Sequence, residues 1–377
     1  MYSNKKGSRV AVVYTHFPHY RQAVFDALMD EGVYDYHFFY DRAGGGHATI
    51  RGGAPREGHY NLPLFRIGPL QFQFSALRLA FSGRYDAFIF LGNPFVLTTW
   101  VAAAIARCRG KLVYFWTHGW LRHEKGGVAL LRKAFYRLAN HLLVYGSRAV
   151  EIGRGSGYPE ERIHVVYNSL DYSLQSSLRD RLLLQGVKLP ERHLPFFLVV
   201  GRLIPALEVD LALDALELSG VNAELVIVGD GPERSRLEHE VNRRGLRVCF
   251  LGAIYDEEEL AKLFMGACAV ISPGKVGLLA MHALSYGAPV LTHGDLERQM
   301  PEVEAVLPGV TGAFFERGDA RSLGALMISV LDGSEGKRLL IEGGAATWTV
   351  IERRYTASVQ VGLIEQALSI ESIRAIS

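Results

Sequence analysis

The sequence predicts an α/β protein made of two doubly wound domains. Short apolar runs rich in β-branched and aromatic residues recur along the 377 residues, and amphipathic helical patterns separate them. Strands that alternate with helices form parallel sheets of βαβ units. Because 49% of the residues are hydrophobic and 21% are charged, the chain can fill two cores and is not disordered.

The distribution of charge also indicates two domains. Residues 1–190 carry 24 Lys and Arg against 13 Asp and Glu, a net charge of +11, whereas residues 191–377 carry 17 against 26, a net charge of −9. A basic half suits an anionic partner such as lipid, an anionic acceptor or nucleic acid. Nucleic acid is not expected, because the basic residues are scattered along the sequence and not interleaved with aromatics in one patch.

The elements follow in order along the chain. In the first half we expect strands at Arg9–Tyr14, Tyr36–Tyr40, Ala87–Leu91, Leu112–Trp116, Leu142–Tyr145 and His164–Tyr167. In the second half we expect them at Phe196–Val200, Glu224–Val228, Val248–Leu251, Ala269–Ser272, Pro289–Thr292 and Ala313–Phe315. Helical patterns cover 130–143, 210–218, 233–244, 257–265, 278–286, 347–354 and 358–368. The domains are expected at 1–180 and 190–345, with C-terminal helices in 346–377.

Composition also bears on location and on metal binding. The three cysteines form no CxxC pair, which predicts a reduced, intracellular protein without a disulfide framework or a zinc site. No signal peptide is visible, and the longest apolar stretch, Phe95–Ala106, is too short to cross a bilayer. We therefore expect a cytoplasmic protein whose membrane contact, if any, is peripheral. The P-loop, G-x-G-x-x-G and D-x-D patterns are missing, so neither a bound metal nor a cofactor is expected.

In open α/β sheets, ligands bind beyond the carboxyl ends of the strands, and this rule selects the candidate residues. In the first half, His118 stands before a glycine that favours a tight turn and an exposed imidazole able to donate a hydrogen bond. A buried, backbone-bonded histidine is the alternative. Candidates for contact with an acceptor follow the first and third strands: His16, His19, Tyr20, Arg21 and Asn93.

The second half offers an anion site. In ISPGKVGLLAMHALSY (271–286), a glycine-rich loop leads into a helix whose N–H groups suit a diphosphate, and Lys275 adds charge. Arg202 comes directly after the first strand of the second half, where its guanidinium could form two hydrogen bonds to a phosphate. An ordinary βα turn, a core histidine at 282 and a salt bridge between the domains at Arg202 are the alternatives. The candidate nucleotide-sugar residues are Gly201, Arg202, Gly229, Gly274, Lys275, Val276, Gly277, Leu278, Leu279 and His282.

Several motifs of the second half form a recognisable set. They are GRLIP (201–205), LVIVGDGPER (225–234), FLG (250–252), GLLAMHALSYGAPVLT (277–292) and MPEVEAVLPGVTGAFF (300–315). Together they resemble the nucleotide-binding domain of family 4 retaining glycosyltransferases of the GT-B fold. The resemblance implies two Rossmann-like domains facing a central cleft, with C-terminal helices crossing back to the first.

The resemblance also implies an activity. The chain would transfer a sugar, with retention and without metal, from a nucleotide diphosphate sugar to a glycan or lipid-linked acceptor. The P-G-x-V-G-L run and residues 299–302 (QMPE) are similar to bacterial members that make surface polysaccharides and glycoconjugates. We expect a cytoplasmic protein that can also work at the inner face of the cell membrane, where its basic half could make a peripheral contact with anionic lipid.

The sequence departs from the family at three positions. Leu207 stands where the family has a lysine, and Gly274 and His282 stand where it has two glutamates. The expected catalytic residues are therefore His118, Arg202, Lys275 in place of the missing charge, and His282 in place of a glutamate. A catalytically degenerate protein that binds a nucleotide sugar or a partner is the alternative. A GT-B epimerase or phosphorylase is a third reading, for which the sequence offers no convincing acid/base pair or cofactor lysine.

Overall fold

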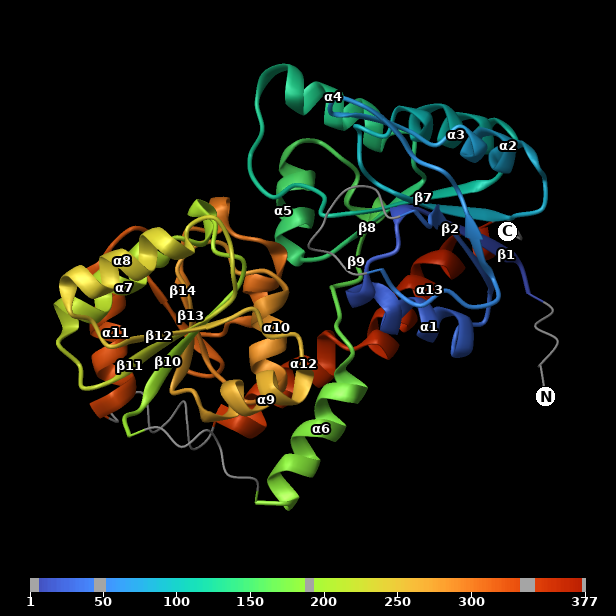
Figure 1. The fold of residues 1–377 in the computed structure, drawn as a ribbon. Helices are drawn as coiled ribbons and strands as arrows, with labels where there is room; N and C mark the ends of the chain where they lie inside the picture. Colours follow the sequence, from blue (N-terminus) through green and yellow to red (C-terminus); the bar gives the residue numbers. More distant parts are fainter. Residues whose placement is uncertain (1–6, 44–51, 187–192, 333–342, 375–377) are drawn as a thin grey trace. The chain divides into compact units, whose positions relative to one another are not determined.

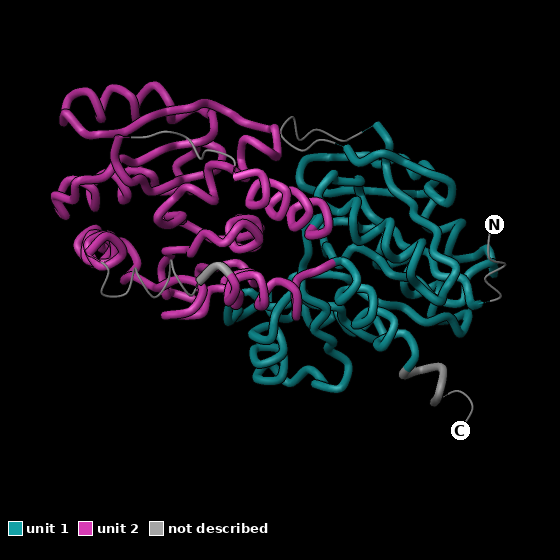
Figure 2. Tube along the Cα trace, turned by 90° about the horizontal axis from the view of Figure 1, so that it is seen from below, with its two compact units in different colours: residues 1–171, 357–377 teal, residues 172–356 magenta. Residues whose placement is uncertain are grey.

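The computed structural model describes residues 7–43, 52–186, 193–332 and 343–374 (Figure 1). The chain divides into two compact units, residues 1–171 with 357–377, and residues 172–356 (Figure 2). Helix α6 (Tyr172–Leu184) lies in the second unit, so the first unit ends before the expected bound at residue 180. Of the two C-terminal helices, α12 (Gly343–Arg354) belongs to the second unit and α13 (Ala357–Arg374) to the first.

The first unit contains a seven-stranded parallel sheet in the order β3-β2-β1-β6-β7-β8-β9. Its strands are β1 (Arg9–His16), β2 (Asp35–Asp41), β3 (His59–Asn61), β6 (Ala87–Leu91), β7 (Leu112–Thr117), β8 (His141–Val144) and β9 (Ile163–Val165). A hairpin of β4 (Phe65–Ile67) and β5 (Leu70–Phe72) follows β3. The strand order reverses between β1 and β6, which is where an open α/β sheet leaves a crevice for a ligand.

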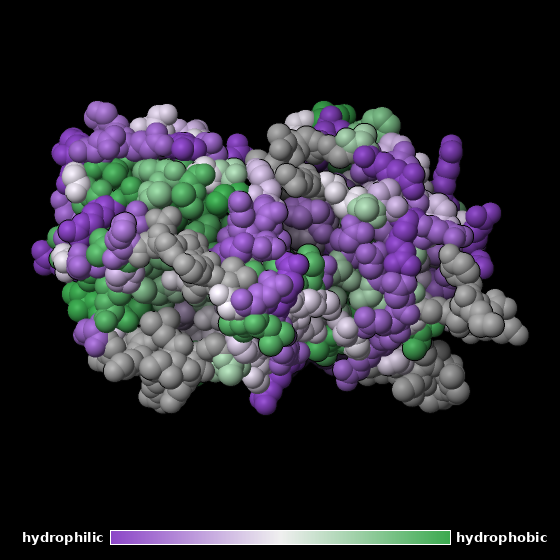
Figure 3. Space-filling model, turned by 60° about the horizontal axis from the view of Figure 1, so that its bottom comes forward, coloured by the Kyte–Doolittle hydropathy of each residue, from purple (hydrophilic) through white to green (hydrophobic). Residues whose placement is uncertain are grey.

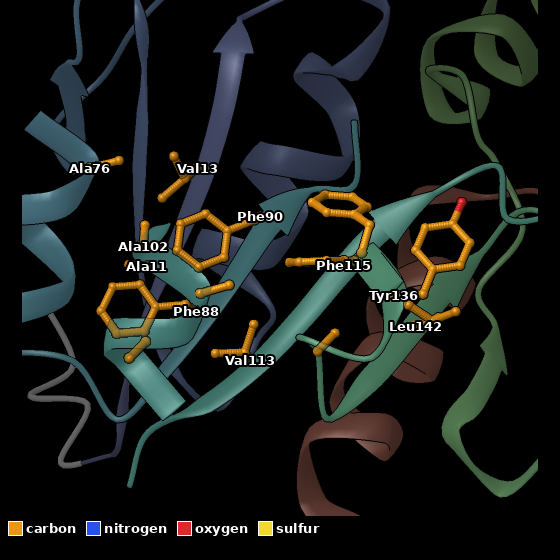
Figure 4. Packing of buried hydrophobic residues seen from close by; sticks show 14 of the residues in the cluster. Ala11, Val13, Ala76, Phe88, Phe90, Ala102, Val113, Phe115, Tyr136 and Leu142 are labelled. Atoms are coloured by element: carbon orange, nitrogen blue, oxygen red, sulfur yellow. The ribbon is translucent and has the colours of Figure 1, made fainter. Parts of the chain in front are cut away.

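Two helical layers cover this sheet (Figure 1). Helix α1 (Gln22–Asp30) and α13 pack on one face, where Phe25, Ile89 and Ile364 are fully buried. Helices α2 (Ser75–Phe81), α3 (Leu97–Cys108), α4 (Gly126–Tyr136) and α5 (Ser147–Gly155) cover the other. There Phe88, Phe90 and Phe115 lie among alanines of α2 and α3 (Figure 4). Both faces of the sheet are apolar because both are covered.

The second unit has a six-stranded parallel sheet in the order β12-β11-β10-β13-β14-β15. Its strands are β10 (Phe196–Val200), β11 (Glu224–Val228), β12 (Val248–Gly252), β13 (Ala269–Ser272), β14 (Val290–His293) and β15 (Gly312–Phe315). Besides α6 and α12, its helices are α7 (Val209–Ser219), α8 (Arg234–Arg244), α9 (Glu257–Gly266), α10 (Leu278–Ser285) and α11 (Ala320–Asp332). The strand order reverses between β10 and β13, so this pair forms the switch point.

All twelve predicted strands overlap strands of the structure. The short strands β3, β4 and β5 were missed, because three residues carry too little periodicity. The helix predicted at 130–143 is wrong at its end, since α4 stops at Tyr136. Asn140 then exchanges hydrogen bonds with the backbone of Val113, which starts β8 against β7. Within the described residues, no helix has both the length and the apolar character needed to span a membrane.

Candidate functional site

The candidate residues of the second unit flank its switch point. Gly201 and Arg202 follow β10, and the loop from Pro273 to Gly277 follows β13. The two exits touch, because a Cβ placed on Gly274 would lie 2.3 Å from the carbonyl oxygen of Ala206. Glycine at 274 is therefore a packing requirement of this edge. A carboxylate at this position would force the two loops apart.

Gly229, at the end of β11, meets the same constraint more severely. Its φ of +142° lies in a region that favours glycine. A Cβ at this position would lie 1.8 Å from the carbonyl oxygen of Gly201, deep inside van der Waals contact. The backbones that leave β10 and β11 are thus in close contact at Gly201 and Gly229, directly before Arg202.

The loop after β13 is braced by Gln299, which is almost fully buried. Its Oε1 accepts from the backbone N–H of Val276 at 2.8 Å. Its Nε2 donates to the Thr292 hydroxyl at 2.9 Å and to the His293 carbonyl at 3.0 Å. The side chain therefore fixes the loop to the end of β14. Gln299 was not among the predicted binding residues, although the QMPE resemblance pointed to it.

Arg202 and Lys275 are both exposed at adjacent strand ends. Among the residues that the structure describes, no carboxylate forms a salt bridge with either side chain, whereas most other arginines of this unit are ion-paired. Helix α10 begins just beyond Lys275, with Gly277 as its N-cap. Two uncompensated cations beside a helix N-terminus form a cradle for an anion.

Leu207 has a structural role in this unit. The side chain packs on the hydrophobic core, and its Cδ1 atom would lie 3.2 Å from a Cβ at Gly201. Neighbouring Glu208 adopts a left-handed conformation, with φ of +55°. This apolar contact explains why leucine fits at position 207. Because Leu207 carries no charge, the positive charge at this edge of the sheet comes from Arg202 and Lys275.

His282 lies one turn into α10, and its ring is held by α9. Its Nε2 lies 2.9 Å from Oε1 of Glu257, which also accepts from the Tyr286 hydroxyl at 2.7 Å. Burial raises the pKa of Glu257, but the hydrogen bonds and the charge of His282 outweigh it and leave that pKa below its ordinary value. An ionised Glu257 accepts a hydrogen bond from Nε2, so Nδ1 is an acceptor whenever the ring is neutral.

The candidates of the first unit surround its own switch point. His16 ends β1, where Nδ1 lies 3.1 Å from the Thr15 hydroxyl, and Asn93 follows β6. A pocket of about 360 Å³ opens at this edge of the sheet. It is lined by Leu91, Gly92, Asn93, Pro94, Thr117, His118, Gly119, Leu121, Arg122, Glu124, Arg132 and Tyr145. Asn93 and His118 are thus brought together, whereas His16, His19, Tyr20 and Arg21 do not line the pocket.

Arg21 is buried behind the pocket. Its guanidinium donates to the Tyr145 hydroxyl at 2.6 Å and lies over the rings of Trp116 and Tyr145, at 5.1 and 4.9 Å. The Tyr145 ring in turn contacts His118 edge-on, with ring centroids 4.9 Å apart. Arg21 therefore acts on the pocket through Tyr145, while His19 is exposed beside Tyr20.

The His118 turn is held by a pair that sequence reasoning missed. Gly119 has φ of +66°, so the turn requires glycine. Arg132 of α4 donates to the Gly119 carbonyl at 3.3 Å. The same guanidinium binds Glu124 through two hydrogen bonds of 2.6 Å. Glu124 and Arg132 stand eight positions apart, in a loop and a helix, and no sequence motif has this spacing, so their contact could not be predicted.

His118 is neutral at physiological pH. The residue is exposed at the pocket, yet the surrounding protein partly desolvates its ring, and Arg21 and Arg132 add positive charge. Together these effects lower its pKa to about 4, with desolvation the largest. A neutral imidazole can donate a hydrogen bond without adding a charge that would repel a cationic transition state.

Acidification is expected to destabilise the first unit. The pKa values of His59 and His164 are each lowered to about 4, chiefly by desolvation, against about 6.5 in the unfolded chain. The unfolded state therefore binds protons first as the pH falls from about 6.5 to 4, and stability, complete above this window, is lost within it. The melting temperature across this range measures the effect.

A matched pair of variants isolates the contribution of His164 to the pH dependence of the melting temperature. His164 faces His141 across β8 and β9, with 2.9 Å between ring nitrogens. His164→Asn should flatten the pH dependence of the melting temperature, whereas His19→Asn, at an exposed position, should leave it unchanged. A wild-type melting temperature that is constant over the window would contradict this prediction.

Part of the sequence matches known glycosyltransferases. Residues 185–346 match the family model described as "Glycosyl transferases group 1". A stretch of 97 residues is 38% identical to a "GDP-mannose-dependent alpha-(1-6)-phosphatidylinositol dimannoside mannosyltransferase" of Mycobacterium tuberculosis. This stretch covers 24% of the chain and only 25% of that relative.

Solved structures extend the likeness to both units. The lipopolysaccharide outer core galactosyltransferase WaaB has a TM-score of 0.69 at 16% identity, over 96% of this chain and 99% of that one. Anabaena HepE in complex with UDP-glucose has a TM-score of 0.67 at 16% identity, over 96% and 100%. The chain therefore has the GT-B fold, and its residues 185–346 match the model of glycosyltransferase group 1.

Proposed function

We propose that the protein is a retaining glycosyltransferase that moves a sugar from a nucleotide diphosphate sugar to a glycan or lipid-linked acceptor. The observation that carries the proposal is the pair of uncompensated cations, Arg202 and Lys275, beside the N-terminus of α10 at the switch point of the second sheet. The group 1 domain spans this edge, and the neighbour HepE was solved with UDP-glucose.

The second unit would hold the donor. The diphosphate would be bound by Arg202, Lys275 and the N–H groups of 277–279. It would lie against the closely packed backbone at Gly201, Gly229 and Gly274. Val276 would keep the loop in place through Gln299. His282 would offer Nδ1 as an acceptor to a hydroxyl of the ribose or the sugar, a role that its bond to Glu257 prepares.

The first unit would hold the acceptor in the pocket beside Asn93, and His118 would donate a hydrogen bond to the sugar in transfer. The bond between C1 of the sugar and the diphosphate breaks while the acceptor oxygen bonds to C1 from the same face. The acceptor proton passes to the leaving phosphate oxygen. Negative charge develops on that diphosphate, and fixed positive groups stabilise it without a metal.

Product analysis tests this proposal. The protein is incubated with UDP-, GDP-, ADP-, CMP- and dTDP-sugars together with glycan and lipid-linked acceptors, and nucleotide release is followed. One nucleotide class should be released in an acceptor-dependent manner, and the anomeric configuration of the product, determined by NMR, should match that of the donor. Inversion would refute the retaining mechanism. Nucleotide binding without any turnover would favour the catalytically degenerate scaffold, as the Leu207, Gly274 and His282 departures would then imply.

Loss of the Glu257 carboxylate is expected to weaken donor binding. Glu257→Gln removes the charge that fixes the His282 tautomer, so Nδ1 is no longer held as an acceptor. The expected rise in donor Kd is up to about tenfold, the value of one hydrogen bond between neutral groups. Titration calorimetry measures it, with Glu259→Gln, on the exposed side of the same helix, as the control. Equal affinities of the two variants would contradict the role of His282.

A further inference from the structure

The segment from residue 62 to 140 has an unusual charge. It contains eleven Lys and Arg but only two acidic residues, Asp86 and Glu124. Glu124 is neutralised by Arg132. This part of the chain runs from the β4–β5 hairpin through α2, α3 and α4, and it supplies much of the positive charge of the first unit.

The same segment exposes many large hydrophobic side chains. It is roughly a fifth of the chain, yet among the described residues it holds ten of the 22 large hydrophobics that are exposed. Leu130 and Ile67 are exposed by 70% and 69%. The ten are Phe65, Ile67, Phe74, Phe81, Phe95, Leu97, Val101, Val128, Leu130 and Leu131. Exposed apolar side chains gathered in this way mark an interaction surface.

These side chains lie on one connected layer. Helices α2 and α3 pack together, and the Trp100 ring of α3 lies 4.8 Å from the Phe135 ring of α4. The backbone of Gln71 in the hairpin donates to the Phe95 carbonyl before α3. All three helices cover one face of the sheet, opposite α1 and α13 (Figure 1). Seen from below, hydrophilic side chains predominate over the first unit (Figure 3).

Cations and apolar side chains alternate on this layer, which we call the α2–α4 face. On α2, exposed Arg78 stands at helical spacing from Phe74 and Phe81, so the three side chains share one side of the helix. In the hairpin, exposed Arg66 stands between Phe65 and Ile67 and points to the opposite face of the strand. On α4, Lys125 precedes exposed Val128, Leu130 and Leu131. An anionic bilayer offers the matching pair of attractions, because acyl chains take up apolar side chains while headgroup phosphates attract Lys and Arg.

We propose that the α2–α4 face docks on an anionic phospholipid membrane. The docking itself does not require transfer activity, but its link to a lipid-linked acceptor rests on the proposed function. Phe95 directly follows Asn93 and Pro94, which line the pocket of the first unit. A bilayer in contact with Phe95 therefore brings membrane-anchored acceptors to the mouth of that pocket.

Vesicle sedimentation without any donor tests the proposal. The full chain should sediment with vesicles of phosphatidylcholine mixed with phosphatidylglycerol, and not with phosphatidylcholine alone. Leu130→Ser with Leu131→Ser, and separately Arg66→Gln with Arg78→Gln, should each weaken binding at least about tenfold. High salt should weaken the wild type as well. Leu184→Ser with Leu218→Ser, at exposed leucines of the second unit, is the matched control and should bind as the wild type does.

Three outcomes would overturn the docking proposal. They are a wild type that ignores anionic vesicles, α2–α4 variants that bind as well as the wild type, and binding that proves to be self-association through this face. Nucleotide binding, followed in parallel by thermal shift, should be equal in all these variants. Failure of vesicle binding with intact nucleotide binding rejects the docking alone, whereas failure of nucleotide binding bears on the proposed function.

Discussion

Replacing Arg202 with alanine is expected to lower kcat about 100- to 1,000-fold, the usual effect of removing one preorganised group that stabilises charge in a transition state. The guanidinium is exposed, and no salt bridge to a described residue holds it, so little folding energy depends on it. The melting temperature of the free protein should therefore stay near that of the wild type. Stabilisation by the donor nucleotide should be lost, because ligand stabilisation follows from affinity.

Two further variants make the Arg202 result specific. Arg321→Ala removes another exposed arginine of the second unit, at the start of α11, and should leave kcat unchanged. Lys275→Ala should weaken donor binding, since this side chain supplies the second cation of the cradle. If Arg202→Ala turns over at the wild-type rate, the diphosphate lies elsewhere. If Lys275→Ala leaves donor affinity unchanged, Lys275 does not replace the missing lysine.

Gly229→Ala is expected to be the most destabilising single substitution at this edge. The new Cβ would lie 1.8 Å from the Gly201 carbonyl oxygen, and backbone, unlike a flexible side chain, has no other rotamer to adopt. The strands β10 and β11 must separate at their ends, at a cost of about 3 kcal/mol or more in the free energy of unfolding. For a unit of this size the melting temperature should fall by roughly 6–12 °C.

Gly362→Ala provides the opposite case. Gly362 lies within α13, and nothing lies within 4 Å of a Cβ placed there. Alanine favours the helix over glycine by about 1 kcal/mol, so stability should rise. Thermal and denaturant unfolding should show a lower free energy of unfolding for Gly229→Ala and a higher one for Gly362→Ala. A Gly229→Ala protein that melts with the wild type would show that the β10 and β11 ends are not in close contact.

The fold was readable from the sequence because its signals are local. Each strand of four or more residues coincides with a short apolar run in the sequence, and Gly119, Gly229 and Gly274 indicated tight turns after three of them. The glycine-rich loop and Arg202 were also found, since both stand directly after strands. The order of the strands comes from the structure alone, which places β10 beside β13 and so brings their exits to one switch point.

What the sequence could not predict depends on contacts between distant residues. The partner of His282 is Glu257, 25 positions away on another helix, and no spacing rule connects them. Arg21 stood in an apparently open loop, yet its guanidinium is buried against Tyr145. Basic residues between 62 and 140 looked dispersed because helices α2 to α4 are separated in sequence, and only packing joins them.

The place of α13 has a consequence for how the protein is made. Ile364, Ala367 and Leu368 are buried against the first unit, and the Tyr114 hydroxyl donates to the Ala367 carbonyl. The second unit is thus an insertion within the first, and α13 is synthesised only after the second unit. During translation the second unit can finish folding first, while the face of the first sheet that α1 and α13 share is covered by α1 alone. Truncation before residue 357 should therefore damage the N-terminal half of the chain and spare the unit beside the cut.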